Sequence, residues 1–198
     1  MDMPEMNMHP LDDESLDKLR RMLGRASVNG GTARKMGIKG IVPAAQSYFA
    51  ELDLTTFNVD TKTEFEAQLD KHTSELRAVM QRVDARDRFW GPARKFLNIF
   101  LRNCAYNRFL CAKFGLERIE TWMELPLDKF AFVGLQRMEQ RKAPGEISRL
   151  PTWPGVVRLT LEKSKRYQDY AQEVADDMGI ARVHLDIHFW NAERDETD

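Results

Sequence analysis

The segment Arg88–Leu101 places two cations at the start of an apolar helix. A Gly-Pro turn leads directly into this helix, which carries Arg94 and Lys95 in its first turn. Cations there oppose the helix dipole, which indicates a role other than helix stability. The free amides after Gly91, together with Arg94, could hold a phosphate. Partial burial beside the apolar face would favour the neutral form of Lys95, a nucleophilic amine.

Asp128 is a candidate catalytic carboxylate within the segment Glu124–Gly134. It lies between an apolar approach and an apolar helix, where partial desolvation would suit it to accept a proton or to face a cationic transition state. The same position is that of a helix N-cap. From the residues alone, a capping aspartate with no other duty is the favoured interpretation.

Asp186 and Trp190 stand four residues apart near the C-terminal end. On a helix they would share one face and offer a carboxylate acceptor beside an aromatic plane. That pair suits a flat, hydrogen-bonding heterocycle, and it suits a core tryptophan beside a capping residue as well. A short helix and a strand both remain open for this segment, because apolar residues alternate at Val183, Leu185, Ile187 and Phe189.

Other familiar catalytic templates do not occur in the sequence. The motifs GxxxxGK[ST], GxGxxG, HExxH, GxSxG and paired CxxC are absent, which excludes P-loop hydrolysis, Rossmann redox chemistry, zinc proteolysis and the α/β-hydrolase mechanism. His184 and His188 offer two nitrogens without a third ligand, so we predict no metal and no cofactor. Cys104 and Cys111 fall on one predicted helix about 10 Å apart, too far for a disulfide.

Charge is unevenly distributed along the 198 residues, although the formal net charge is only -1. Residues 1–17 hold six acids and no lysine or arginine, and residues 191–198 hold four acids and one arginine. Residues 82–118, by contrast, carry nine basic and three acidic side chains. This concentration favours a polyanionic partner, although a solvated helix face gives the same pattern.

Apolar spacing predicts a mainly α-helical protein. With 42% hydrophobic and 31% charged residues, the chain has the composition of a globular protein that can form one core. We predict a flexible acidic tail over residues 1–11, one helical domain over residues 12–192 and an acidic tail over residues 193–198. Helices are predicted near residues 12–23, 43–52, 62–83, 93–114, 128–138 and 160–178.

Two segments between the predicted helices are rich in turn-forming residues. Residues 25–40 contain four glycines and four basic residues, which suits a surface loop whose amides and cations meet phosphate. A plain connector explains that stretch equally well. Residues 140–155 contain three prolines and two glycines and predict a long exposed loop or hinge.

The order of these motifs resembles that of the helix-hairpin-helix superfamily of DNA glycosylases, in particular the archaeal 8-oxoguanine DNA glycosylases. In that family a lysine in the second helix of the hairpin is followed by a proline–apolar–aspartate segment, as Lys95 is by Pro126-Leu-Asp128, with the lysine and the aspartate 33 residues apart. Its C-terminal motif His-Leu-Asp-x-x-x-Trp is similar to the segment His184–Trp190. The resemblance covers roughly residues 85–192.

The resemblance implies a single helical domain of the helix-hairpin-helix glycosylase type, an enzyme that flips a modified base out of DNA and cleaves its N-glycosidic bond. Lys95 would attack the sugar C1′ and form a Schiff base, which also permits strand cleavage, and Asp128 would stabilise the developing positive charge. The base pocket would contain Asp186, Trp190 and His184. Independently of the resemblance, the residue types add Trp90 as an aromatic candidate for the pocket. They also offer basic candidates for contacts to DNA phosphates, namely Arg86, Arg88, Arg94, Arg102, Lys35 and Lys39.

Two departures from the family pattern leave the substrate open. The hairpin reads Trp-Gly-Pro-Ala-Arg-Lys in place of a Gly-x-Gly turn, and residues 144–155 form an insertion. The substrate is therefore either an oxidised guanine or a hypermodified base of invading phage DNA, as in bacterial anti-phage glycosylases. We expect a monomeric cytoplasmic protein with no membrane association, because the sequence shows no secretion signal and no long apolar run.

A different class of function is also consistent with the sequence. The chain could be a non-catalytic helical nucleic-acid-binding or regulatory module, with Lys95 on a solvated face and Asp128 only capping a helix. The enzyme requires these two side chains to converge on one basic cleft with Asp186 and Trp190 on its wall, whereas the module does not. Their relative position therefore discriminates between the two hypotheses.

Overall fold

The computed structural model describes residues 11–85, 89–142 and 144–191, and these residues form helices and loops without any strand. The mainly α prediction is confirmed. The predicted tails lie outside the described residues, apart from Leu11. The elements are, in chain order, α1 (Asp13–Ser27), α2 (Ile41–Glu51), η1 (Leu54–Phe57), α3 (Lys62–Gln81), α4 (Trp90–Tyr106), α5 (Arg108–Phe114), η2 (Leu116–Trp122), α6 (Lys129–Lys142), η3 (Val156–Arg158), α7 (Leu161–Met178), η4 (Arg182–His184) and α8 (Leu185–Asn191).

Side-chain caps begin the helices close to where the sequence predicts them. Asp12 accepts a hydrogen bond from the Ser15 amide at 2.7 Å at the start of α1. Thr61 and Glu64 form a reciprocal capping box at the start of α3. Such caps satisfy amides that have no partner within the helix, which is why these polar residues mark the helix starts.

The prediction of one continuous helix over residues 93–114 is wrong. Asn107 separates α4, which ends at Tyr106, from α5, which begins at Arg108. The Asn107 Oδ1 accepts hydrogen bonds from two amides of α5 at 3.1 and 3.2 Å, so the asparagine caps a new helix instead of continuing the old one. Cys104 and Cys111 consequently lie on different helices, and both are free thiols.

The C-terminal segment is helical, so the strand interpretation is wrong. Residues 182–184 form η4, and α8 follows immediately. Asp186 and Trp190 both lie on α8. No helix in the described part of the chain is long and apolar enough to cross a membrane.

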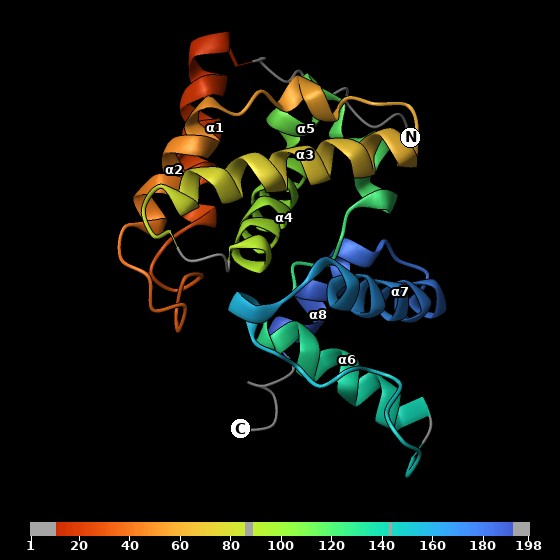
Figure 1. Cartoon of the computed structure of the whole chain (residues 1–198). Coiled ribbons are helices and arrows are strands. Elements are labelled where there is room, and N and C mark those ends of the chain that lie inside the picture. The colour runs from red at the N-terminus through yellow and green to blue at the C-terminus, as the bar shows by residue number, and fades with distance from the viewer. Residues whose placement is uncertain (1–10, 86–88, 143, 192–198) are drawn as a thin grey trace, which may run out of the picture.

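The buried apolar residues form two clusters. The first is built from α1 to α5, the 3-10 turns among them and Val183 of η4, and the second from α6, α7 and α8 with the loops near them. Figure 1 shows the first group above the second, with the N-terminal end of α4 pointing toward the second. Gly91–Leu101 is buried throughout, so polar side chains in this stretch of α4 need partners inside the protein.

The chain passes from the first cluster to the second through a segment that is firmly held. The Gln168 Oε1 accepts a hydrogen bond from the backbone amide of Leu125 at 3.0 Å, and the Gln168 Nε2 donates one to the backbone carbonyl of Leu125 at 2.8 Å. The buried guanidinium of Arg182 donates to the carbonyls of Trp122 and Met123 at 3.1 and 3.2 Å. These bonds fix the approach to α6, and with it the position of that helix's first residues relative to α4.

Helix α8 is placed by a close approach to α6, which gives a first prediction. A Cβ atom built on Gly134 would lie 2.2 Å from the ring of Phe189. We expect Gly134→Ala to lower the free energy of unfolding by about 1–3 kcal/mol, because the ring must leave its place in the second cluster. Urea denaturation measures the effect, with Gly30→Ala as control, since a Cβ atom there meets nothing within 4 Å. Equal midpoints for the two variants would contradict the prediction.

Candidate active site

Lys95 of α4 and Asp128 at the start of α6 lie together. The Lys95 Nζ is 3.3 Å from the Asp128 Oδ2, and their side chains are 8% and 21% exposed. The same Nζ donates a hydrogen bond to the Thr32 carbonyl at 3.3 Å. The pair therefore joins the first helix cluster to the second, and it lies near the surface without being freely solvated.

Asp128 serves as a helix cap and as the partner of Lys95 at the same time. Its Oδ1 accepts hydrogen bonds from the amides of Phe130 and Ala131 at 2.9 and 3.0 Å, which is an N-cap arrangement. Its Oδ2 faces Lys95. The predicted cap is therefore present, but the interpretation that Asp128 only caps the helix is wrong, because its other oxygen atom faces Lys95.

A second ion pair lies two turns further along α4, where Arg102 contacts Asp186 of α8. Burial lowers the pKa of Arg102, and the nearby groups of Tyr106 and Asp128 oppose that shift electrostatically. Arg102 is therefore close enough to Asp128 for their charges to interact. The structure gives Arg102, predicted as a phosphate contact, a carboxylate partner within the protein.

Two exposed aromatic rings flank this group of charges. Trp190 of α8 is 57% exposed and Phe130 of α6 is 41% exposed, and their ring centroids are 6.0 Å apart in an edge-on arrangement. Phe130 follows Asp128 by two residues, and its backbone amide donates to the capping carboxylate. The sequence analysis did not select Phe130 as a site residue. Its position in the first turn of the helix that Asp128 caps is the signal that could have identified it.

His184, predicted for the base pocket, belongs to a row of polar side chains in contact with one another, which the sequence did not reveal. Its Nδ1 lies 2.8 Å from the hydroxyl of Tyr106, and its Nε2 lies 3.0 Å from a carboxylate oxygen of Glu120. The rings of Tyr106 and His184 also stack, with centroids 5.6 Å apart. Tyr106 lies one helical turn beyond Arg102 on α4. The connected side chains of Tyr106, His184 and Glu120 therefore border the Arg102–Asp186 pair.

The prediction that Arg94 holds a phosphate is wrong, because its donors are already engaged inside the protein. Its side chain is 6% exposed and makes two hydrogen bonds of 2.9 Å to the Glu124 carboxylate. It also donates to Asp70 at 2.8 Å and to Thr73 at 3.0 Å. Burial opposes its charge, but the two carboxylates outweigh burial and raise the pKa of Arg94.

Trp90, the remaining residue predicted for the base pocket, is half-buried among apolar neighbours of the second cluster. Its ring centroid lies 5.7 Å from the Arg94 guanidinium carbon. These contacts place Trp90 in the packing around α4.

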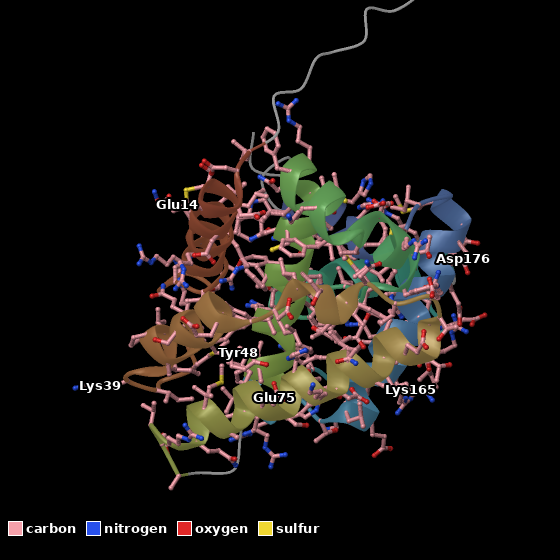
Figure 2. The ribbon with its side chains drawn as sticks, turned by 90° about the horizontal axis from the view of Figure 1, so that it is seen from above. Glu14, Lys39, Tyr48, Glu75, Lys165 and Asp176 are labelled. Carbon is pink, nitrogen blue, oxygen red and sulfur yellow. The ribbon has the colours of Figure 1, made fainter. Side chains whose placement is uncertain are left out.

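The predicted phosphate contacts differ in how they are placed. Lys35 and Lys39 are exposed on the loop between α1 and α2, and Figure 2 shows Lys39 at its outer end, directed away from the body of the protein. Neither lysine has an ion-pair partner among the described residues. Arg86 and Arg88 lie outside the described residues.

The described residues contain no group of three or more histidine, cysteine or carboxylate side chains that could hold a metal ion. A small polar hollow at the far end of α6, lined in part by Glu139, Arg149 and Tyr170, includes none of the predicted site residues. Comparison of the chain with protein-family models, with curated proteins and with solved structures finds no match.

Proposed function

We propose that the protein is a DNA glycosylase that flips out a modified base and cleaves its N-glycosidic bond. The observation that carries the proposal is the contact between Lys95 and Asp128, which are 33 residues apart in the chain and whose charged atoms are 3.3 Å apart. A non-catalytic module has no need to bring these two side chains together in a partly buried place. A glycosylase that uses an amine does.

The two side chains have complementary roles in the proposed reaction. The Asp128 carboxylate accepts a proton from the Lys95 ammonium and leaves a neutral amine. That amine forms a bond to C1′ as the N-glycosidic bond breaks, and the base leaves with the bonding electrons and takes up a proton. The leaving base takes that proton from Asp128, and the carboxylate so regenerated, at close range and partly desolvated, stabilises the positive charge that develops on the sugar.

The groups around this pair suit an extruded base. Phe130 and Trp190 present aromatic surface on which a heterocycle can stack. The Arg102–Asp186 pair offers donors and an acceptor on the adjoining stretch of α4 and α8. The exposed Lys35 and Lys39 supply sequence-independent attraction for the phosphate backbone. We propose either an oxidised guanine or a hypermodified phage base as substrate.

The first experiment identifies the released base. Purified protein is incubated with oxidised DNA and, separately, with hypermodified phage DNA, and free bases are measured by mass spectrometry. A base released from one of them supports the proposal and names the substrate. Release from neither, with salt-sensitive DNA binding intact, would favour the binding module instead.

Lys95 is tested by borohydride trapping on a duplex that contains an abasic site, which requires no knowledge of the base. The amine condenses with the C1′ aldehyde, water leaves, and borohydride reduces the imine to a stable cross-link. We expect Lys95→Gln to lose the cross-link and to retain DNA binding. Lys113→Gln is the control, because Lys113 is an exposed lysine of α5 paired with Asp13. Cross-linking that survives in Lys95→Gln would exclude Lys95 as the nucleophile.

A further inference from the structure

The loop between α1 and α2, residues 28–40, reaches the candidate nucleophile from a distant part of the chain. Thr32 precedes Lys95 by 63 residues, yet its carbonyl oxygen accepts a hydrogen bond from the Lys95 Nζ. The Asp128 Oδ2 lies at the same distance, 3.3 Å, from that Nζ. The nitrogen of Lys95 therefore has two acceptors from two elements of the fold, which together restrict how it can turn.

The turn that carries the Thr32 carbonyl is built by the side chain of Asn29. The Asn29 Oδ1 accepts hydrogen bonds from the amides of Gly31 and Thr32 at 2.8 and 3.1 Å. The backbone amide of Asn29 donates to the Thr32 Oγ1 at 2.9 Å, and the side-chain Nδ2 of Asn29 donates to the Ala26 carbonyl at 2.8 Å. This pattern is that of an asparagine turn, in which one side chain sets the backbone that follows it.

The loop is also fixed at its ends and against α4. Val28 and Met36 are buried in the first cluster on either side of the Asn29 turn. The Asn103 Nδ2, on α4, donates to the Ser27 Oγ at 2.9 Å. The carbonyl of Thr32 is therefore held in a defined position relative to the helix that carries Lys95.

We propose that Asn29 is a positioning residue for Lys95, acting through the Thr32 carbonyl; this inference rests on the proposed glycosylase function. A neutral amine has two N–H groups and one lone pair. One N–H stays on the Thr32 carbonyl after Asp128 has taken a proton. Once Asp128 has passed that proton on, the N–H bond to the Thr32 carbonyl limits the directions in which the lone pair can meet C1′, so the turn orients the amine for attack.

Substitution of Asn29 tests this role with a matched pair of variants. Asn29→Ala removes the acceptor for the Gly31 and Thr32 amides, whereas Asn29→Asp keeps an acceptor oxygen there and loses only the Nδ2 donor to the Ala26 carbonyl. We expect Asn29→Ala to slow cross-linking to abasic-site DNA under single-turnover conditions by about 10–100-fold, as misplacement of a reacting group does. We expect Asn29→Asp to restore most of the rate. Affinity for the same DNA and the urea midpoint are measured in parallel.

The outcomes separate this inference from the proposed function. If the wild-type protein forms no cross-link that depends on Lys95, the proposed nucleophile fails and the inference fails with it. If the wild type reacts and Asn29→Ala reacts at the same rate, only the inference is overturned. Equal losses in the alanine and aspartate variants, with lowered urea midpoints in both, would also overturn it, because a purely structural role predicts that result.

Discussion

Asp128→Asn is expected to reduce base excision by about 10²–10⁴-fold, the range associated with a lost acid–base group, while DNA binding is retained. The asparagine oxygen can still accept the hydrogen bonds of the α6 amides that Asp128 caps. It carries no charge, however, so it neither takes a proton from Lys95 nor stabilises the cationic sugar. The loss therefore falls on the chemical step.

Single-turnover base release, on the substrate identified by mass spectrometry, measures this effect. Asp12→Asn is a matched control, because Asp12 caps α1 through the same kind of hydrogen bond and lies far from Lys95 in the chain. We expect that variant to excise at the wild-type rate. Unchanged excision by Asp128→Asn would remove the carboxylate from the mechanism.

Arg94→Ala is expected to destabilise the protein by about 3–5 kcal/mol, the cost of leaving one member of a buried ion pair without its partner. The Glu124 carboxylate would lose both of its hydrogen bonds from the guanidinium and keep only the one from Asn98, at 2.9 Å. Urea denaturation at neutral pH measures the change. Arg118→Ala, which breaks an exposed pair with Asp60, should have a far smaller effect.

The pH dependence of that loss identifies its cause. Burial raises the pKa of Glu124, but the charge and hydrogen bonds of Arg94 outweigh burial, so the net pKa lies below the ordinary 4.5. In the wild type, the stability from this shift is present above about pH 4.5 and is lost as the pH falls toward the lowered value. Without Arg94, burial favours the neutral acid, so the deficit of Arg94→Ala should shrink on acidification. A deficit that is constant from pH 7 to pH 4 would exclude the Glu124 charge as its source.

The features that the sequence predicted correctly depend on local chemistry. Caps such as Asp12 and Asp128 satisfy amides within three residues, so their position in the sequence determines where a helix starts. The break at Asn107 follows the same rule. It was missed because apolar residues continue at helical spacing on both sides of the asparagine and hide the cap.

The features that the sequence did not predict depend on contacts between distant residues. The two cations at the start of α4 correctly indicated a role other than helix stability, but the sequence could not show that Arg94 pairs with Glu124 and Asp70 inside the protein. The contact of Lys95 with Thr32 spans 63 residues and uses a backbone carbonyl, which no side-chain pattern records. Only packing of the loop against α4 determines it.

The division of the Lys95–Asp128 pair between two helix clusters has a consequence for the newly made chain. Lys95 leaves the ribosome before Asp128, and most residues of its cluster precede α6 in the chain. On the proposed function, the amine has no carboxylate beside it during that interval and cannot be activated. On that proposal, only a chain in which α4 and α6 have both folded contains a reactive pair.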